Sequence, residues 1–584
     1  MSSSGRRQDS SWQYFNKTVI PGVTGCKATC KSCNKTMQGI VSRMKDHLSK
    51  CIAFAREESS SLIPTPRDPA MPPEGIVERM KRTFSQMNAD DDPSFSSSIQ
   101  SPAKKMKTTS LSNYVHTTTA SEKKALDLQV AKMIYATNSP FMFIEHPEVL
   151  KTFKMLRPGY EPPSRLDIGN ALLEEAYTQA YSGCKEKVEG KLVSMEMDGW
   201  SNIHNEPVVC TSISTYDGDT FLTSTIDTQD ERHTGDNLEA IAESAIKKIE
   251  EELGCEVGSF VTDNASNMRK CRSQLSESRS VLTHPCSAHV ADCLAKDIDN
   301  SDVKSEIVEI VKYFRRHHVP NALYKQKGGK KLQLPICVRW NSVHDCLQGY
   351  VDNWAVLVNV VDSHRSEIDS DICEKVLNID LKRQAEEYLS KMKPLAVALD
   401  RLQANECHLA DAVVIWKDLA EKFEKSDDLP LADTLRLRAR MSIALTPAHF
   451  LAYLLDPRYK DGTLLTTEEQ ESAMEFLSEY NPLALPSVLS YIAKSKPFGS
   501  YMFAPEVLKK TDPLVWWKSQ ASLLDKNIMS LVEQLFTARA STSNIERIFS
   551  TFGLVHSKLR NRLQIQKAGK LVFFVQVSEH VKYL

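Results

Sequence analysis

The stretch from Leu192 to Asp263 constrains the fold most, because its apolar residues change spacing in a defined order. Four segments have the composition of strands: 192–197, 208–216, 220–226 and 257–262. Before the last of them, Thr234 opens a segment whose apolar residues recur at helical spacing. The order strand, strand, strand, helix, strand predicts an α/β sheet in which the last strand lies parallel to the first.

Two aspartates stand at the ends of the first and last of these strands. Asp198 follows the first strand, and Asp263 follows the last. On parallel neighbours the two carboxylates would meet, and such a pair suits divalent cations that flank a scissile phosphate. Each also has an ordinary interpretation, because Asp198-Gly199 is a hairpin-turn dipeptide and Asp263 is a good helix N-cap for Ala265 onward. Their convergence on one sheet edge favours a cation site, which needs a third carboxylate.

The charge is distributed unevenly along the chain. The net charge at pH 7 is -2, but residues 1–56 contain ten Lys or Arg and only two Asp or Glu. A basic arm on a near-neutral chain is typical of DNA binding, because Lys and Arg displace the counterions that condense on phosphates. The alternative is a solvated basic tail, and charge alone does not decide between the two.

Four candidate zinc ligands lie inside this basic arm. They have Cys-x2-Cys and His-x3-Cys spacing: Cys30, Cys33, His47 and Cys51. The first pair suits a turn that presents two thiolates, and the second pair shares one face of a helix. Together they predict a closed tetrahedral Cys3His site for structural Zn²⁺. Cys26 falls outside the spacing.

The surroundings of these ligands indicate a small DNA-binding module. We expect a helix over 39–50 to present three basic side chains to DNA: Arg43, Lys45 and Lys50. Upstream, Trp12 and Phe15 are expected to pack over a module that is otherwise too small to form a core. The segment resembles a BED-type zinc finger, a DNA-binding module with aromatic residues ahead of its Cys-x2-Cys pair.

Composition and hydropathy exclude several classes of protein. Apolar residues make up 41% and charged residues 25% of the chain, a normal globular mixture. The longest apolar run, Phe450 to Leu455, is far shorter than the roughly 18 residues of a membrane span. No apolar segment follows the polar N-terminus as in a secretory signal, so the 14 cysteines indicate thiols and metal ligands rather than disulfides. We expect a protein of the cytoplasm or nucleus with no membrane partner.

Two further segments are expected between the finger and the sheet. Residues 57–113 contain seven prolines among serine clusters, which predicts a flexible linker. Its patch at 104–107 suits nuclear import or is a solvated charge cluster. A small helical domain should follow. Its first helix is indicated by a capping box at Thr119, its second by Pro147 in the first turn, and a third is expected from Ile168 to about Lys187.

Three motifs resemble those of hAT-superfamily transposases. They are Met197-Asp198-Gly199-Trp200-Ser201, Val261-Thr262-Asp263-Asn264-Ala265-Ser266-Asn267 and Ser541-Thr542-Ser543-Asn544-Ile545-Glu546-Arg547-Ile548-Phe549-Ser550. The resemblance implies a BED-like finger, a ribonuclease-H-like core, a large helical insertion before the third acid, and a C-terminal dimerisation region. It also implies that Asp198, Asp263 and Glu546 bind catalytic Mg²⁺ or Mn²⁺. From the residues alone, Glu546 is an ordinary solvated charge beside an arginine on a helix.

Other residues match the same family. Cys286 and His289 match its Cys-x2-His pair, for which we expect a hydrogen-bonded role, because no common four-ligand zinc pattern surrounds them. Arg339-Trp340 resembles the family's Arg-Trp motif, whose tryptophan stacks on a base flipped out during cleavage. An aromatic platform beside a cation suits base stacking, although a tryptophan at a helix start also packs on a core. The apolar run 571–575 suits either the family's dimer interface or the chain's own core.

Together these features predict a multidomain α+β protein with C-terminal dimerisation helices. The expected domains are a Cys3His zinc finger (1–56), a linker (57–113), a helical DNA-binding or oligomerisation domain (114–188), the first part of a ribonuclease-H-like core (189–342), an all-helical insertion (343–510) and the end of the core with the dimerisation region (511–584).

The expected function is that of a nuclear DNA transposase. It would bind double-stranded DNA at its element's ends, self-associate, and cut and join DNA with Mg²⁺ or Mn²⁺. Two alternatives remain open. One is a nuclear DNA-binding, dimerising regulator that descends from such an enzyme and no longer cuts. The other is an unrelated nuclease with a ribonuclease-H-like core, which fits the acids but not the finger and the tail.

Overall fold

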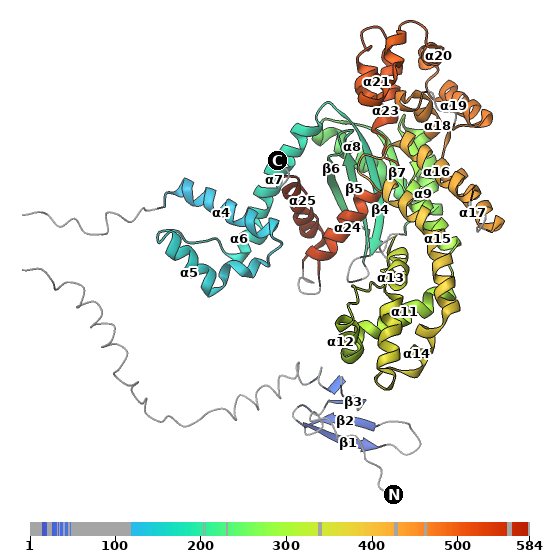
Figure 1. Cartoon of the computed structure of the whole chain (residues 1–584). Helices are drawn as coiled ribbons and strands as arrows, with labels where there is room; N and C mark the ends of the chain where they lie inside the picture. Colours follow the sequence, from blue (N-terminus) through green and yellow to red (C-terminus); the bar gives the residue numbers. More distant parts are fainter. Residues whose placement is uncertain are drawn as a thin grey trace, which may run out of the picture. The chain divides into compact units, whose positions relative to one another are not determined.

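The computed structural model divides into two compact units between Thr108 and Thr109 (Figure 1). The structure describes residues 14–19, 26–31, 33, 35–38, 41, 43, 44, 47, 118–201, 204, 206–228, 232–336, 341–425, 430–460, 464–557 and 563–581. Several sequence predictions lie outside these residues: the linker 57–113 with its patch at 104–107, and the aromatic residue Trp12.

The N-terminal unit contains a small antiparallel sheet. Its strands pair in the order β1-β2-β3, with bounds β1 (Phe15–Val19), β2 (Cys26–Cys30) and β3 (Thr36–Gln38). Described residues 41, 43, 44 and 47 are helical, in the segment where the sequence predicts a helix. The buried apolar side chains described here are Phe15, Ala28, Cys30 and Met44. So small a core needs a staple such as a metal ion to be stable.

The C-terminal unit is built around a mixed five-stranded sheet. The strand order is β6-β5-β4-β7-β8, with bounds β4 (Leu192–Ser201), β5 (Pro207–Ser214), β6 (Thr220–Asp227), β7 (Glu256–Thr262) and β8 (Leu282–Pro285). Strand β4 is antiparallel to β5 and parallel to β7, which confirms the predicted parallel pair. The sequence pattern did not indicate β8, which has only four residues and ends at a proline.

The connection between β6 and β7 is helix α8 (Gly235–Leu253). Thr234 caps it as predicted, because its side chain accepts a hydrogen bond from the N–H of Asn237. Gly254 ends it in the left-handed conformation, which a residue without a Cβ adopts without strain. The helix buries its apolar stripe, from Leu238 to Leu253, and so brings β7 back beside β4.

Helices precede the sheet, as the sequence predicts. They are α4 (Ala120–Ala136), η3 (Phe141–Glu145), α5 (Pro147–Leu156), α6 (Arg165–Gly169) and α7 (Ala171–Val188). Thr119 and Glu122 form the predicted capping box, and Pro147 occupies the first turn of α5. The prediction of one continuous third helix is wrong. Asn170 leaves the helical conformation and divides the segment into two helices, α6 and α7.

A large helical region lies between β8 and the last two helices. Its bounds are α10 (Ser287–Asp297), α11 (Ser301–Arg316), α12 (His318–Gln326), α13 (Ser342–Ser363), η4 (Arg365–Glu367), α14 (Ser370–Leu377), α15 (Ile379–Leu402), α16 (Leu409–Glu424), α17 (Leu431–Ala444), α18 (Pro447–Leu455), η5 (Pro457–Tyr459), α19 (Thr467–Tyr480), η6 (Pro482–Ala484), α20 (Leu485–Ile492), η7 (Ser500–Phe503), α21 (Pro505–Lys510), α22 (Pro513–Lys518) and α23 (Lys526–Thr537). Among the described helices, none has both the length and the apolar content of a membrane span.

The last two helices return to the sheet. Figure 1 shows α24 (Ser543–Val555) and α25 (Ile565–Val581), in red, beside strands from the middle of the chain. Leu571, Val572 and Phe573 of α25 are buried in the same apolar cluster as Met195 of β4. This part of the apolar C-terminal run therefore packs on the chain's own core.

Two buried histidines join the sheet to the helical region. His284 of β8 and His449 of α18 are both fully buried, with ring centroids 5.5 Å apart. Neither Nε2 atom has a hydrogen-bond partner in the described structure. Burial lowers the pKa of His284 to about 3, with a smaller contribution from Arg272, and burial also lowers the pKa of His449. Both rings are therefore neutral in the folded chain near pH 6.

We expect the two buried histidines to destabilise the C-terminal unit as the pH falls below about 6.5, whereas the raised pKa values of Glu196, Asp198 and Glu546 act in the opposite direction. The unfolded chain then binds protons at both histidines and the folded chain does not, which at pH 5.5 costs roughly 1.4 kcal/mol per histidine. Urea unfolding at pH 7.5 and 5.5 measures this. Relative to wild type, His284→Leu should gain about one histidine's share of stability on going from pH 7.5 to pH 5.5, and the exposed control His318→Gln should not. An unchanged difference in His284→Leu would contradict the assignment.

Candidate active site

Asp198 lies within a strand and not in a turn. Strand β4 continues to Ser201, and Asp198 pairs with Cys210 of β5, so the hairpin-turn interpretation is wrong. The N–H of Gly199 donates a hydrogen bond of 2.7 Å to Asp198 Oδ1. Burial raises the pKa of Asp198 to about 7, and the Asp263 carboxylate adds to the shift. The two aspartates therefore lie close enough to repel each other.

Asp263 follows directly after β7, the parallel neighbour of β4. Its Oδ1 accepts the N–H of Ala265 at 3.1 Å, and α9 (Ser266–Ser278) begins one residue later. Asp263 thus forms the turn before α9. The N-cap residue of the helix is Ala265 and not Asp263, so the N-cap interpretation of Asp263 is wrong. The described structure gives no hydrogen bond for the other carboxylate oxygen of Asp263, and the carboxylate contributes to the raised pKa of Asp198.

Glu546 lies in the first turn of α24, far away in sequence from both aspartates. Burial raises the pKa of Glu546 to about 8, and the next contributions come from Asp198 and Asp292. The structure thus brings Glu546 into the same electrostatic environment as Asp198. The carboxylate oxygens of Asp198, Asp263 and Glu546 are farther apart than the ligand atoms of a closed metal site. Among the described residues, only one group of three metal-ligating side chains has all its ligand atoms within 4.8 Å of one another, and that group lies in the N-terminal unit.

A fourth carboxylate, Asp292, lies beside Glu546. It is buried on α10 and forms an ion pair of 2.6 Å with Lys296, one turn further along the helix. Sequence reasoning missed it, although it lies three residues after His289 and so faces the same side of α10. The Lys296 ammonium lowers the pKa of Glu546, whereas Asp292 raises it.

Cys286 connects this region to the start of α24. Its buried Sγ accepts hydrogen bonds from the N–H of His289 and from the N–H and hydroxyl of Thr542, each 3.3 Å long. Burial raises the pKa of the thiol to about 11, so it is protonated at neutral pH. The N–H of Ser287 also donates to the Ala540 carbonyl at 2.9 Å. Cys286 therefore has the kind of hydrogen-bonded role that the sequence suggested.

A buried arginine, Arg539, supports the segment that leads to Glu546. Arg539 donates to the carbonyls of Asn405, Thr215 and Tyr216, and the buried Glu196 of β4 is its main charge partner. Burial raises the pKa of Glu196 to about 7, and the Ser212 hydroxyl donates to its carboxylate. Sequence reasoning missed both residues, because Glu and Arg are rarely fully buried. The hydrogen bonds of Arg539 tie the approach to α24 to Ser194 of β4 and to Thr215 and Tyr216 after β5.

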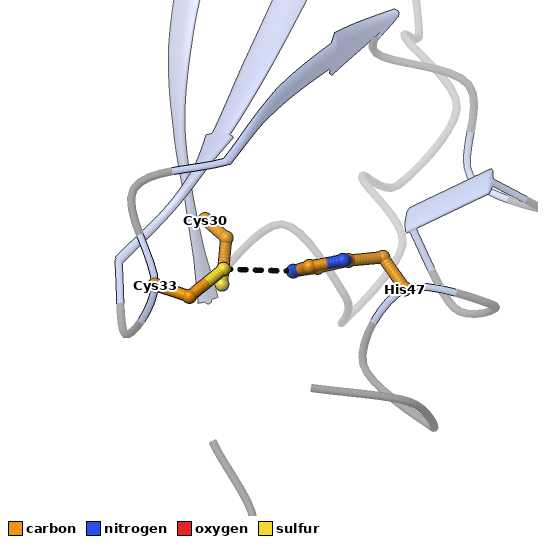
Figure 2. Close-up of side chains that lie close together, drawn as sticks. All are labelled: Cys30, Cys33 and His47. Atoms are coloured by element: carbon orange, nitrogen blue, oxygen red, sulfur yellow. Dashed lines mark hydrogen bonds between the residues drawn. The ribbon is translucent and has the colours of Figure 1, made fainter. Parts of the chain in front are cut away.

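The candidate zinc ligands lie together in the N-terminal unit. Cys30 ends β2, Cys33 lies in the following turn, and His47 lies in the helical segment. Figure 2 shows the three side chains pointing toward one another, with Cys33 Sγ 3.2 Å from His47 Nε2. All three ligand atoms lie within 4.8 Å of one another. Two sulfurs and one imidazole nitrogen are a donor set consistent with zinc.

Several other site predictions lie outside the described residues. These are the fourth zinc ligand Cys51, the basic residues Lys45 and Lys50, and the Arg339-Trp340 motif. Arg43 is described, exposed and helical. Phe15 packs against His47, one of the candidate ligands, with their ring centroids 5.9 Å apart.

Two family models match the chain. A domain of unknown function (DUF659) matches residues 163–314, which include Asp198, Asp263 and Cys286. The hAT family C-terminal dimerisation region matches residues 498–576, which include Glu546. No curated protein matches the chain.

The second match supports self-association of the chain. Since Leu571, Val572 and Phe573 are buried in the chain's own core, contacts between copies must use other residues. The two matched segments carry between them all three candidate acids, and the structure packs α24 of the second segment against β4 and β5 of the first. The two matches support an hAT-family transposase or a protein derived from one.

Proposed function

We propose that this protein is a DNA transposase that cuts and joins DNA by metal-dependent phosphoryl transfer. The observation that carries the proposal is the electrostatic coupling of three acids from distant segments. The Asp263 carboxylate raises the pKa of Asp198, and the Asp198 carboxylate raises that of Glu546. Carboxylates held near one another in a partly buried place are costly unless a cation neutralises them.

The donor set fits Mg²⁺ or Mn²⁺, which take oxygen ligands. When bound, such ions activate the nucleophile and stabilise the leaving oxygen of the scissile phosphate. Asp198 would supply ligands from the sheet, Asp263 from the turn after β7, and Glu546 from α24. The strand order β6-β5-β4-β7-β8, with the first acid on the central strand, supports a ribonuclease-H-like core interrupted by the helical region.

We propose that DNA is recognised by a BED-type finger. Cys30, Cys33 and His47 would hold Zn²⁺ with Cys51 as the fourth ligand, which is supported by the convergence of the first three. Arg43 is exposed on the helical segment and would contact DNA. Lys45 and Lys50, together with the basic arm 1–56, would add phosphate contacts.

The remaining parts of the proposal concern the assembly on DNA. Trp340 beside Arg339 would stack on an unpaired base near the cleavage site. Self-association would place two fingers in one complex, and two linked fingers raise the effective concentration at paired DNA ends. A DNA substrate and the basic patch at 104–107 support a nuclear location.

Cleavage of DNA that flanks the gene tests the proposed function. Purified protein with Mg²⁺ or Mn²⁺ should cut at defined positions at the gene's borders, and EDTA should stop the reaction. Specific binding without cleavage, in wild type and Asp198→Asn alike, would instead assign the chain to the DNA-binding regulators derived from such enzymes. Cleavage without sequence preference would favour an unrelated nuclease.

A further inference from the structure

Arg272 is a buried arginine beside the candidate cation site. It lies in the middle of α9 and is only 6% exposed. Side chains on a helix lean toward its N-terminus, so the guanidinium reaches back to the segment that joins β7 to α9. This segment contains Asp263. The sequence gives no sign of the role, because an arginine in a polar helix is usually a solvated charge.

The guanidinium binds three consecutive residues of that segment. Nη1 donates to the carbonyl oxygen and the hydroxyl of Thr262 and to the carbonyl oxygen of Asp263. Nη2 donates to Oδ1 of Asn264 at 2.7 Å. On the other side, Asp263 Oδ1 accepts the N–H of Ala265. The backbone and the carboxylate of Asp263 are therefore each held by a separate hydrogen bond.

The charge of Arg272 matters as well as its hydrogen bonds. Burial lowers the pKa of Arg272 to about 10, so the guanidinium remains protonated at neutral pH. Among the charges that act on it, the Asp263 carboxylate contributes most. The Asp263 carboxylate repels that of Asp198 and so raises the pKa of Asp198. The buried Arg272 cation offsets part of this repulsion.

We infer that Arg272 is a positioning residue, which holds Asp263 in the orientation that a divalent cation requires. The inference rests on the proposed cation site. Only a planar fork of donors can reach two carbonyls, a hydroxyl and an amide oxygen at once. Lysine keeps the charge but lacks this geometry. Residues that orient a metal ligand typically change metal affinity by about 10- to 100-fold when they are replaced.

Arg272→Lys in the full-length, zinc-loaded protein tests the inference. The matched control is Arg279→Lys, which replaces an arginine at the end of the same helix that pairs with Glu243 and Glu250 and does not touch the Asp263 turn. Two quantities are measured in both variants and in wild type: Mn²⁺ affinity by electron paramagnetic resonance, and hydrogen exchange of the amides at 262–266. Melting temperatures verify that each variant is folded.

We expect Arg272→Lys to bind Mn²⁺ at least tenfold more weakly and to exchange these amides faster, while Arg279→Lys behaves like wild type in both measurements. If cleavage is observed, a higher Mn²⁺ concentration should restore its rate in Arg272→Lys, because a purely structural defect would not respond to metal.

Wild-type Mn²⁺ affinity or unchanged exchange in folded Arg272→Lys would overturn the inference alone. Equal Mn²⁺ binding by wild type and Asp198→Asn would overturn the proposed cation site, and the role of Arg272 with it. Arg272→Gln, which keeps a planar amide without the charge, provides a second variant if Arg272→Lys does not fold. The same two measurements then decide the inference.

Discussion

Replacing Cys33 with serine should release zinc and abolish specific DNA binding, while the C-terminal unit stays folded. The described core of the N-terminal unit is four apolar side chains, so the metal must supply most of its stability. Zinc-finger peptides gain about 10–16 kcal/mol from zinc binding, which makes loss of a ligand equivalent to unfolding. The separate C-terminal unit has its own sheet and its own apolar clusters.

Zinc content by atomic absorption and binding to the gene's flanking DNA by mobility shift measure this prediction. Cys26→Ser is the matched control, because Cys26 lies in the same strand as Cys30 but outside the group of ligands. It should keep both zinc and DNA binding. DNA binding by Cys33→Ser at wild-type affinity would show that the finger assignment is wrong.

Replacing Glu546 with glutamine should lower the rate of DNA cleavage at least ~10³-fold. The substitution removes the negative charge of one ligand and keeps the size of the side chain, so the interaction that is lost is the one with the cation and with the charge of the transition state. A 10³-fold lower rate corresponds to an activation barrier about 4 kcal/mol higher. The apo protein should be no less stable, because the raised pKa of Glu546 shows that its ionised form is unfavourable there.

Glu533→Gln is the control for this prediction. Glu533 lies on α23, forms an ion pair of 3.0 Å with Lys518, and is not among the main charges that raise the pKa of Asp198 or Glu546. Single-turnover cleavage with saturating Mg²⁺ should give a wild-type rate for Glu533→Gln. Equal rates for Glu546→Gln and wild type would remove Glu546 from the site.

The sequence predicted best what depends on local pattern. The apolar runs that end at Asp198 and Asp263 predicted the parallel strands β4 and β7. The capping box at Thr119 predicted the start of α4. Both signals can be read from the sequence because periodicity and capping are properties of neighbouring residues. Asn170, which interrupts the third predicted helix, carries no comparable local signal. Strand β8 was missed because its four residues, two of them polar, are too few to show a period.

The parts that were missed depend on contacts between distant segments. Glu196 and Arg539 are buried residues whose charges interact, and Arg272 folds back on the segment that precedes its own helix. Charged residues are normally assigned to the surface, so only the three-dimensional structure shows these roles. Glu546 was identified by resemblance to a family motif, since nothing in its own surroundings in sequence distinguishes it from a solvated glutamate.

A crystal structure with Mn²⁺ would test the central claim most directly, because anomalous scattering locates each ion. We expect at least one Mn²⁺ with oxygen ligands from Asp198, Asp263 and Glu546, at roughly 2.1 Å, the distance typical of the related ion Mg²⁺. The three carboxylates, loosely spaced without the ion, would then close around it. Mn²⁺ bound elsewhere at a saturating concentration, with none at these three side chains, would show that they are not the catalytic metal site.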